Sequence, residues 1–252
     1  MGKYIKYEIK GSYRFVLGVL ALVLILMTGI YLKGFDRLGI IGGLAGLAIV
    51  IGYIAEIYYI MDSFRKELYE DRGYLTFTLP LSGKQIIASK LVVSTLWILV
   101  IGFVTMGYFL ILFRKDINIG QLEIGLLEEF LPQMIYYGIY MLVLGINTLI
   151  LIYLSMALGR VTIRNKKLGG LWFLIFIVLS TFVQIGYNYV YQTFPHYLNL
   201  SSFNLINIDN GAGLTISSGS IYMNLATAIY TILIGIVSFF TTSYLVENKI
   251  DI

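Results

Sequence analysis

The residues that could carry catalytic chemistry in this chain are few. Glu128 and Glu129 are adjacent carboxylates, which in a membrane enzyme could activate a metal-bound water for peptide hydrolysis. A catalytic zinc site needs nitrogen or sulfur ligands as well. The 252-residue chain has one histidine, His196, and no cysteine. We therefore predict no catalytic site, no metal site and no disulfide, and we expect this chain not to be an enzyme.

The chain also lacks the sequence of a phosphate-binding loop. The nearest approach is Gly83-Lys84, which has no glycine at the required upstream position and is followed by Gln85 rather than Ser or Thr. A second glycine-rich stretch, 39–46, has the small-xxx-small spacing that lets membrane helices approach closely. The sequence therefore predicts no nucleotide site and no bound cofactor.

Composition places the chain in a lipid bilayer. It is 58% hydrophobic and 13% charged, whereas a soluble domain is nearer a quarter charged. Several apolar runs exceed the roughly 18 residues that mark a spanning helix. We predict an all-α polytopic membrane protein, with residues 1–252 forming a single transmembrane domain. The six expected spans are about Phe15–Leu32, Leu38–Met61, Leu91–Phe113, Met134–Leu158, Leu168–Tyr191 and Ile221–Val246.

The distribution of basic residues predicts the orientation. Most Lys and Arg residues precede the first span or lie in the second and fourth loops, and few lie in the others. Because cytoplasmic loops carry the excess of positive charge, we expect a multi-pass protein of the cell membrane with both termini in the cytoplasm. The sequence pI of about 9.0 then reflects membrane topology, and we expect no nucleic-acid partner.

Residues 62–90 form the most highly charged connection between spans. Apolar residues recur at Ile60, Phe64 and Leu68, a spacing typical of an amphipathic helix that continues beyond the second span. Gly73 is a suitable helix stop, and Ser82 with Gln85 has the pattern of a capping box that starts the next helix. We expect a helix, an elbow and a second helix; the elbow residues are Gly73, Tyr74, Pro80 and Ser82.

Part of this connection resembles a known family. The run Glu70-Asp71-Arg72-Gly73-Tyr74-Leu75-Thr76-Phe77-Thr78-Leu79-Pro80-Leu81-Ser82, followed by Lys84 and Ser89-Lys90-Leu91, is similar to the second-loop signature of ABC-2 type transporter permeases. The resemblance implies the membrane subunit of an ABC exporter. Such a subunit would pair with a second permease, either the same or a homologous chain. It would also dock two copies of a cytoplasmic ABC ATPase, which would bind ATP and Mg²⁺.

The resemblance also implies roles for particular segments. The coupling helix that meets the ATPase would comprise Phe64, Arg65, Glu67, Leu68, Tyr69, Glu70, Asp71 and Arg72. Residues 1–14 would form an amphipathic helix along the inner membrane face, since Tyr4, Ile5 and Ile9 alternate with lysines in a pattern that suits an interfacial helix. The exported substrate would be amphipathic or hydrophobic, such as a peptide, an antibiotic or a lipid-like molecule.

Polar residues inside the spans are candidates for a translocation path, because such groups are costly in a membrane. The amides that we single out are Asn147, Gln184, Asn188 and Asn224. Hydrogen bonding between helices is the alternative for each of them. Glu56, near the cytoplasmic end of the second span, could pair with a basic loop or couple transport to protons.

Residues 193–220 form the longest predicted external segment. The segment lacks Lys and Arg, and it is apolar although rich in Asn, Ser and Gly. It either re-enters the membrane or packs as an extracellular loop over the spans.

Two other functions remain open. A secondary transporter would need mid-membrane carboxylates and an internal repeat; Glu56 is the one candidate carboxylate, and no repeat is evident. A non-transporting membrane scaffold or immunity subunit would need neither feature. Copurification with an ATPase would separate these classes from an ABC permease.

Overall fold

The computed structural model describes residues 1–32, 38–69, 81–112, 124–162, 170–200, 202, 204–207, 213–217 and 220–249. Six of its helices are long and apolar enough to cross a membrane, which confirms the coarse prediction of a helical, multi-pass membrane protein. The chain divides into two compact units, each considered by itself below. Unit one comprises Met1–Leu81 and Gln85–Gln121, and unit two comprises Ser82–Lys84 and Leu122–Ile252.

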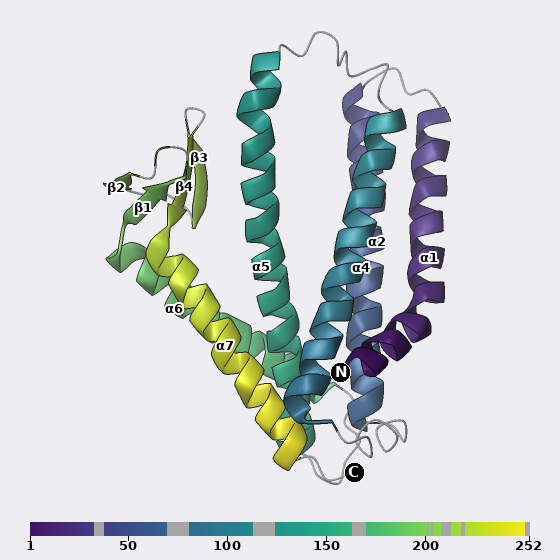
Figure 1. The fold of residues 1–252 in the computed structure, drawn as a ribbon, viewed down its shortest axis with the longest axis vertical. Coiled ribbons are helices and arrows are strands. Elements are labelled where there is room, and N and C mark those ends of the chain that lie inside the picture. The colour runs from purple at the N-terminus through teal and green to yellow at the C-terminus, as the bar shows by residue number, and fades with distance from the viewer. Residues whose placement is uncertain are drawn as a thin grey trace. The chain divides into compact units, whose positions relative to one another are not determined.

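Unit one contains helices α1 (Gly2–Leu32), α2 (Leu38–Tyr69) and most of α4 (Gly83–Leu112). Figure 1 shows the first turns of α1 running at an angle to the rest of that helix. One apolar cluster is centred on Val16, Val93, Trp97 and Ile101, and a second on Val23, Met27 and Ala48. The core of this unit is therefore built from one face of each helix.

The helix α2 continues well past its apolar stretch. It runs to Tyr69, so residues 62–69 are helical. Asp62 forms ion pairs with Arg65 and Lys66, at the i, i+3 and i, i+4 spacings that stabilise a helix. The predicted stop at Gly73 lies outside the described residues. The next helix, α4, begins at Gly83, directly after the predicted cap Ser82.

Unit two contains α5 (Ile124–Thr162), α6 (Leu171–Thr193) and α7 (Leu225–Asn248). The hydroxyl groups of Tyr140 on α5 and Tyr187 on α6 lie 3.2 Å apart and share a hydrogen bond. Tyr230 on α7 donates to the backbone oxygen of Val183 on α6 at 3.0 Å. The helix α5 begins well before the predicted position Met134, and it includes Pro132.

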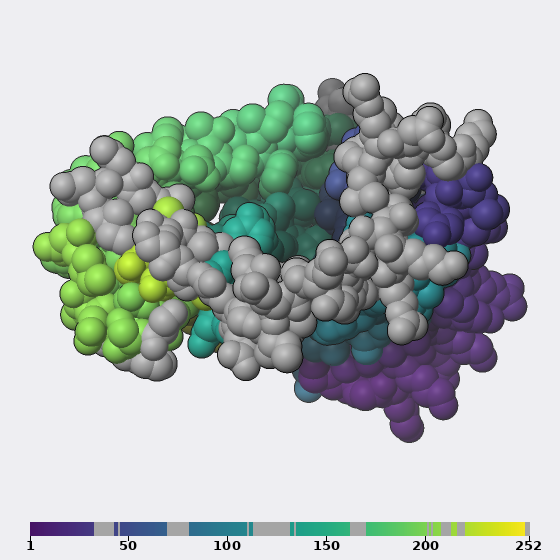
Figure 2. Space-filling model, turned by 90° about the horizontal axis from the view of Figure 1, so that it is seen from above, coloured from purple at the N-terminus to yellow at the C-terminus, as the bar shows by residue number. Residues whose placement is uncertain are grey.

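A small antiparallel sheet joins α6 to α7. Its strands are β1 (His196–Asn199), β2 (Leu205–Asn207), β3 (Leu214–Ser217) and β4 (Ser220–Asn224), in the spatial order β2-β1-β4-β3. Tyr197 in β1 faces Ile206 of β2 and Asn224 of β4, and Ile216 in β3 faces Ile221 of β4. Figure 2 shows these strands, in yellow-green, gathered at one end of α6.

The sheet corrects two predictions. The chain is not all-α, because residues 193–220, for which a re-entrant segment or an extracellular loop was expected, contribute β1, β2, β3 and the first residue of β4. The last span does not begin at Ile221, because Ser220–Asn224 pairs as β4 and the helix begins at Leu225. The sheet buries Tyr197 and Ile221, whereas Leu205 and Ile206 of β2 stay exposed.

Candidate functional site

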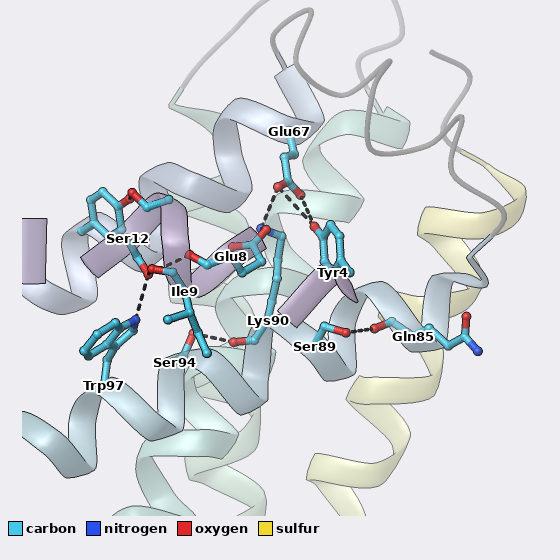
Figure 3. A network of polar contacts seen from close by, with 12 residues as sticks. Tyr4, Glu8, Ile9, Ser12, Glu67, Gln85, Ser89, Lys90, Ser94 and Trp97 are labelled. Atoms are coloured by element: carbon cyan, nitrogen blue, oxygen red, sulfur yellow. Dashed lines mark hydrogen bonds and ion pairs between the residues drawn. The ribbon is translucent and has the colours of Figure 1, made fainter. Parts of the chain in front are cut away.

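A buried lysine joins the three helices of unit one. The Nζ atom of Lys90 on α4 lies 3.0 Å from Oε1 of Glu8 on α1 and 2.8 Å from Oε1 of Glu67 on α2. The Lys90 side chain is 3% exposed, whereas those of Glu8 and Glu67 are 17% and 12% exposed. Figure 3 shows the three side chains converging from their separate helices.

Further hydrogen bonds extend this contact along α1. The hydroxyl group of Tyr4 donates to the two carboxylate oxygens of Glu67 at 3.3 and 3.4 Å. The indole N–H of Trp97 on α4 donates to the hydroxyl oxygen of Ser12 at 2.8 Å (Figure 3). Tyr4, Glu8 and Ser12 are four residues apart, so they lie on one face of α1. We call Tyr4, Glu8, Ser12, Glu67, Lys90 and Trp97 the Lys90 network.

The ion pairs of Lys90 hold the Glu8 and Glu67 side chains in place. Two carboxylates share one ammonium group in a largely buried setting. Removal of one partner from a buried ion pair leaves a charge without compensation, at a cost of about 3–5 kcal/mol. The network therefore holds the end of α2 against α1 and α4, two residues before the described part of α2 ends at Tyr69.

The network attaches the N-terminal segment, for which the sequence predicts an interfacial amphipathic helix, to α2 and α4. Ile5 and Ile9 pack against the cluster around Trp97, while Lys3, Lys6 and Lys10 are exposed. Sequence reasoning identified the apolar and basic faces of residues 1–14. It missed the partners of Glu8 and Lys90, although Glu8 is the one acid among the basic residues that precede the first span.

The predicted coupling helix divides into a buried and an accessible face. Phe64 and Leu68 are 0% and 2% exposed, and Glu67 belongs to the Lys90 network. Arg65 and Lys66 have side chains that are 40% and 38% exposed, and Tyr69 is half-buried. The remaining predicted residues of this site lie outside the described residues: Glu70, Asp71, Arg72, Gly73, Tyr74 and Pro80.

The structure does not bring the four predicted path residues into one cluster. Asn147 on α5 donates to its own helix at Val143, and its Oδ1 atom lies against Gly235 of α7. Gln184 and Asn188 are exposed neighbours on α6, with Nε2 and Oδ1 at 3.5 Å. The Oδ1 atom of Asn147 is buried and has no hydrogen-bond partner among the described residues.

Asn224 has a structural position at the junction of β4 and α7. Its Oδ1 atom accepts a hydrogen bond from the backbone N–H of Thr227 at 3.0 Å, so it caps α7. Its Nδ2 atom donates to the backbone oxygen of Phe194 at 2.9 Å. The side chain is fully buried, and it therefore links the end of α6 to the start of α7.

Replacing Asn224 with alanine should lower the free energy of unfolding by about 1–2 kcal/mol, because the helix cap is lost. Chemical denaturation of the detergent-solubilised protein would measure this change. Asn188→Ala removes an exposed amide and should have little effect. Equal stability of the two variants would contradict the capping role.

Glu56 is a second buried carboxyl group of unit one. It is 1% exposed, and neither carboxyl oxygen has a hydrogen-bond partner within the described part of the chain. The ion pair expected between Glu56 and a basic loop is therefore not found among those residues. The same residues contain no group of three or more side chains suited to binding a metal ion.

Comparison of the chain with family models, with curated proteins and with solved structures found no match in any of the three.

Proposed function

We propose that this chain is the transmembrane permease subunit of an ATP-binding cassette exporter. A separate cytoplasmic ATPase would hydrolyse ATP, and this chain would use the resulting movement to export an amphipathic or hydrophobic substrate, such as a peptide, an antibiotic or a lipid-like molecule. A second permease, either identical or homologous, would complete the pathway across the bilayer. The resemblance of residues 70–82 to the second loop of ABC-2 type permeases supports this proposal.

One structural observation carries the proposal furthest. The helix α2 continues from its apolar stretch through a charged segment to Tyr69, and Glu67 near its end is fixed by Lys90. A continuous helix with a fixed end can transmit a displacement of the following loop into the membrane. A loosely attached loop would absorb the same displacement.

The accessible face of this helix suggests how the partner binds. Arg65 and Lys66 are the most exposed of its described charged side chains, and both are cations. Phe64 and Leu68 are buried within this chain, so they support the helix from inside. We expect the ATPase to present acidic groups to Arg65 and Lys66, since complementary charge steers and orients such contacts.

A pull-down experiment tests the proposal. The tagged chain is isolated from native membranes in mild detergent, and the proteins that accompany it are identified by mass spectrometry. We expect a soluble ATPase, and we expect Arg65→Glu with Lys66→Glu to reduce its recovery by about tenfold, because the interface charges become repulsive. The matched control is Lys3→Glu with Lys6→Glu, which reverses two exposed cations on α1.

Failure to capture an ATPase with the unmodified chain would overturn the proposal. The buried carboxyl group of Glu56, which has no hydrogen-bond partner among the described residues, would then favour an ion-coupled secondary transporter, because intramembrane carboxyl groups commonly mark ion pathways. Glu56→Gln should abolish transport in that case.

A further inference from the structure

The buried face of α2 contains a carboxyl group among apolar residues. Gly52, Glu56, Ile60, Phe64 and Leu68 recur at intervals of four residues, and each of them is buried. Glu56 is 1% exposed, and neither Oε1 nor Oε2 has a hydrogen-bond partner among the described residues. An acidic side chain therefore occupies a position whose neighbours on the same face are glycine or apolar.

Contacts on either side of Glu56 show that α1 covers this part of α2. Four residues before Glu56, a Cβ atom at Gly52 would lie 2.7 Å from Cγ2 of Val23. Three residues after it, the hydroxyl group of Tyr59 donates to the backbone oxygen of Gly11 at 3.2 Å. Glu56 thus lies on α2 between two points of contact with α1.

The helix α4 covers the same stretch of α2. The ring of Tyr53, three residues before Glu56, packs against the cluster that contains Trp97 and Ile101. The Tyr53 hydroxyl group also approaches α4 closely, because a Cβ atom at Gly102 would lie 2.5 Å from it. These contacts, all within unit one, explain why Glu56 is shielded from solvent.

The groups around Glu56 do not supply a compensating charge. The titratable residues on the facing stretches of α1 and α2 are Tyr13, Arg14, Tyr53, Tyr58 and Tyr59. The facing stretch of α4, residues 94–102, contains none. Arg14 is exposed, and its Nε atom donates to the hydroxyl group of Tyr13 at 3.0 Å. Within the described ranges, an ionised Glu56 would therefore have no cation beside it.

A proton is the ligand that suits such a carboxyl group. An isolated carboxylate is costly in an apolar interior, and a buried carboxyl group takes up a proton instead. A metal cation would need several oxygen ligands at once, and the described residues contain no group of three or more side chains suited to holding a metal ion. A proton needs only the carboxyl group itself.

We propose that Glu56 is a proton-binding site in the interior of unit one. Its carboxyl group holds a proton while α1, α2 and α4 are packed as described, and it releases the proton when these helices separate enough to admit water. Acidification therefore stabilises the packed arrangement of the three helices. The inference does not rest on the proposed function, because it concerns the packing of unit one alone.

Infrared spectroscopy of the purified full chain in detergent tests the protonation directly, since a carboxylic acid and a carboxylate absorb at different frequencies. At about pH 6, where exposed carboxyl groups are ionised, we expect Glu56→Gln to lose a carboxylic-acid band of the wild type. The matched control is Asp62→Asn on the same helix. It should lose carboxylate bands instead, because Asp62 pairs with Arg65 and Lys66. Loss of carboxylate bands in Glu56→Gln would overturn the inference.

The dependence of stability on pH supplies a second measurement. The unfolded chain exposes Glu56 and releases its proton above about pH 4.3, whereas the packed state retains it. Stability falls with rising pH where the folded state binds more protons. From about pH 5 to about pH 6, the folding equilibrium constant of the wild type relative to Glu56→Gln should therefore fall by about tenfold. Chemical denaturation of both proteins measures this ratio, and a ratio that does not change with pH would contradict the proposal.

Two further comparisons cover the case in which Glu56→Gln does not fold, as judged by aggregation on size-exclusion chromatography. Glu56→Met then serves as the reference in both measurements, because an uncharged side chain of similar size suits the same interior. The wild-type infrared spectrum requires no variant. The absence of any carboxylic-acid band at about pH 6, where an exposed glutamate is ionised, would show that Glu56 holds no proton.

Discussion

Replacing Lys90 with methionine should lower the free energy of unfolding by about 3–5 kcal/mol, because Glu8 and Glu67 then remain buried without a compensating charge. The lysine side chain is 3% exposed and contacts both carboxylates, so solvent cannot replace it. Chemical denaturation in detergent, followed by the fluorescence of the two tryptophans, Trp97 and Trp172, would measure the loss. In the full complex, the variant should also uncouple ATP hydrolysis from export, since the end of α2 is no longer fixed.

Two further variants separate this effect from a general loss of charge. Lys10→Met removes an exposed lysine of α1 and should leave the unfolding free energy nearly unchanged. Adding Glu8→Gln and Glu67→Gln to Lys90→Met should recover much of the lost stability, because the buried charges are then removed together. A Lys90→Met protein as stable as the wild type would show that the Lys90 network does not hold α2.

Replacing Phe64 with alanine should cost about 3–5 kcal/mol of unfolding free energy, the usual range for truncating a fully buried aromatic side chain. Phe64 is 0% exposed although it lies in the charged end of α2. Arg65→Ala, at the next position, should cost no more than about 1 kcal/mol, because its ion pair with Asp62 is partly solvated. The same denaturation experiment compares the two.

The opposite order is expected when ATPase recovery is measured. Arg65→Ala should reduce recovery, whereas Phe64→Ala, corrected for the amount of folded protein, should not. Phe103→Ala is the matched control for stability, since Phe103 is 76% exposed on α4. If Phe64→Ala is no less stable than Phe103→Ala, the division of α2 into a supporting face and an accessible face is wrong.

The helices were predictable from sequence because long apolar runs have few alternatives in a bilayer. The start of α5 at Ile124 was not predictable on this basis. The length of an apolar run marks the part of a helix that can lie in the bilayer, and it does not show where the same helix begins outside that run. Phe64 and Leu68 were identified by their spacing, but spacing alone does not tell a face packed within the chain from one that meets a partner.

The contacts of the candidate site were the least predictable part. Lys90 meets Glu8 across 82 positions of the sequence, and Gly83 meets Glu247 across 164. Local patterns carry no information on such pairs. Positive-inside reasoning grouped Lys90 with the loop cations, whereas the structure buries it between two acids. A lysine at the entrance to a span, together with a lone acid in a basic segment, is the signal that could have indicated this pairing.

The sheet between α6 and α7 restricts how these two helices can move. Strand β1 pairs with β4, and Asn224 bonds to Phe194, so the end of α6 and the start of α7 are fixed to one another. Any change in the separation of the two helices must therefore be smallest at the sheet and grow towards their opposite ends. The pair behaves as a hairpin hinged at the sheet, so a change in the separation of its helices would be taken up at the C-terminal end of α7, where Glu247 accepts a hydrogen bond from the backbone N–H of Gly83.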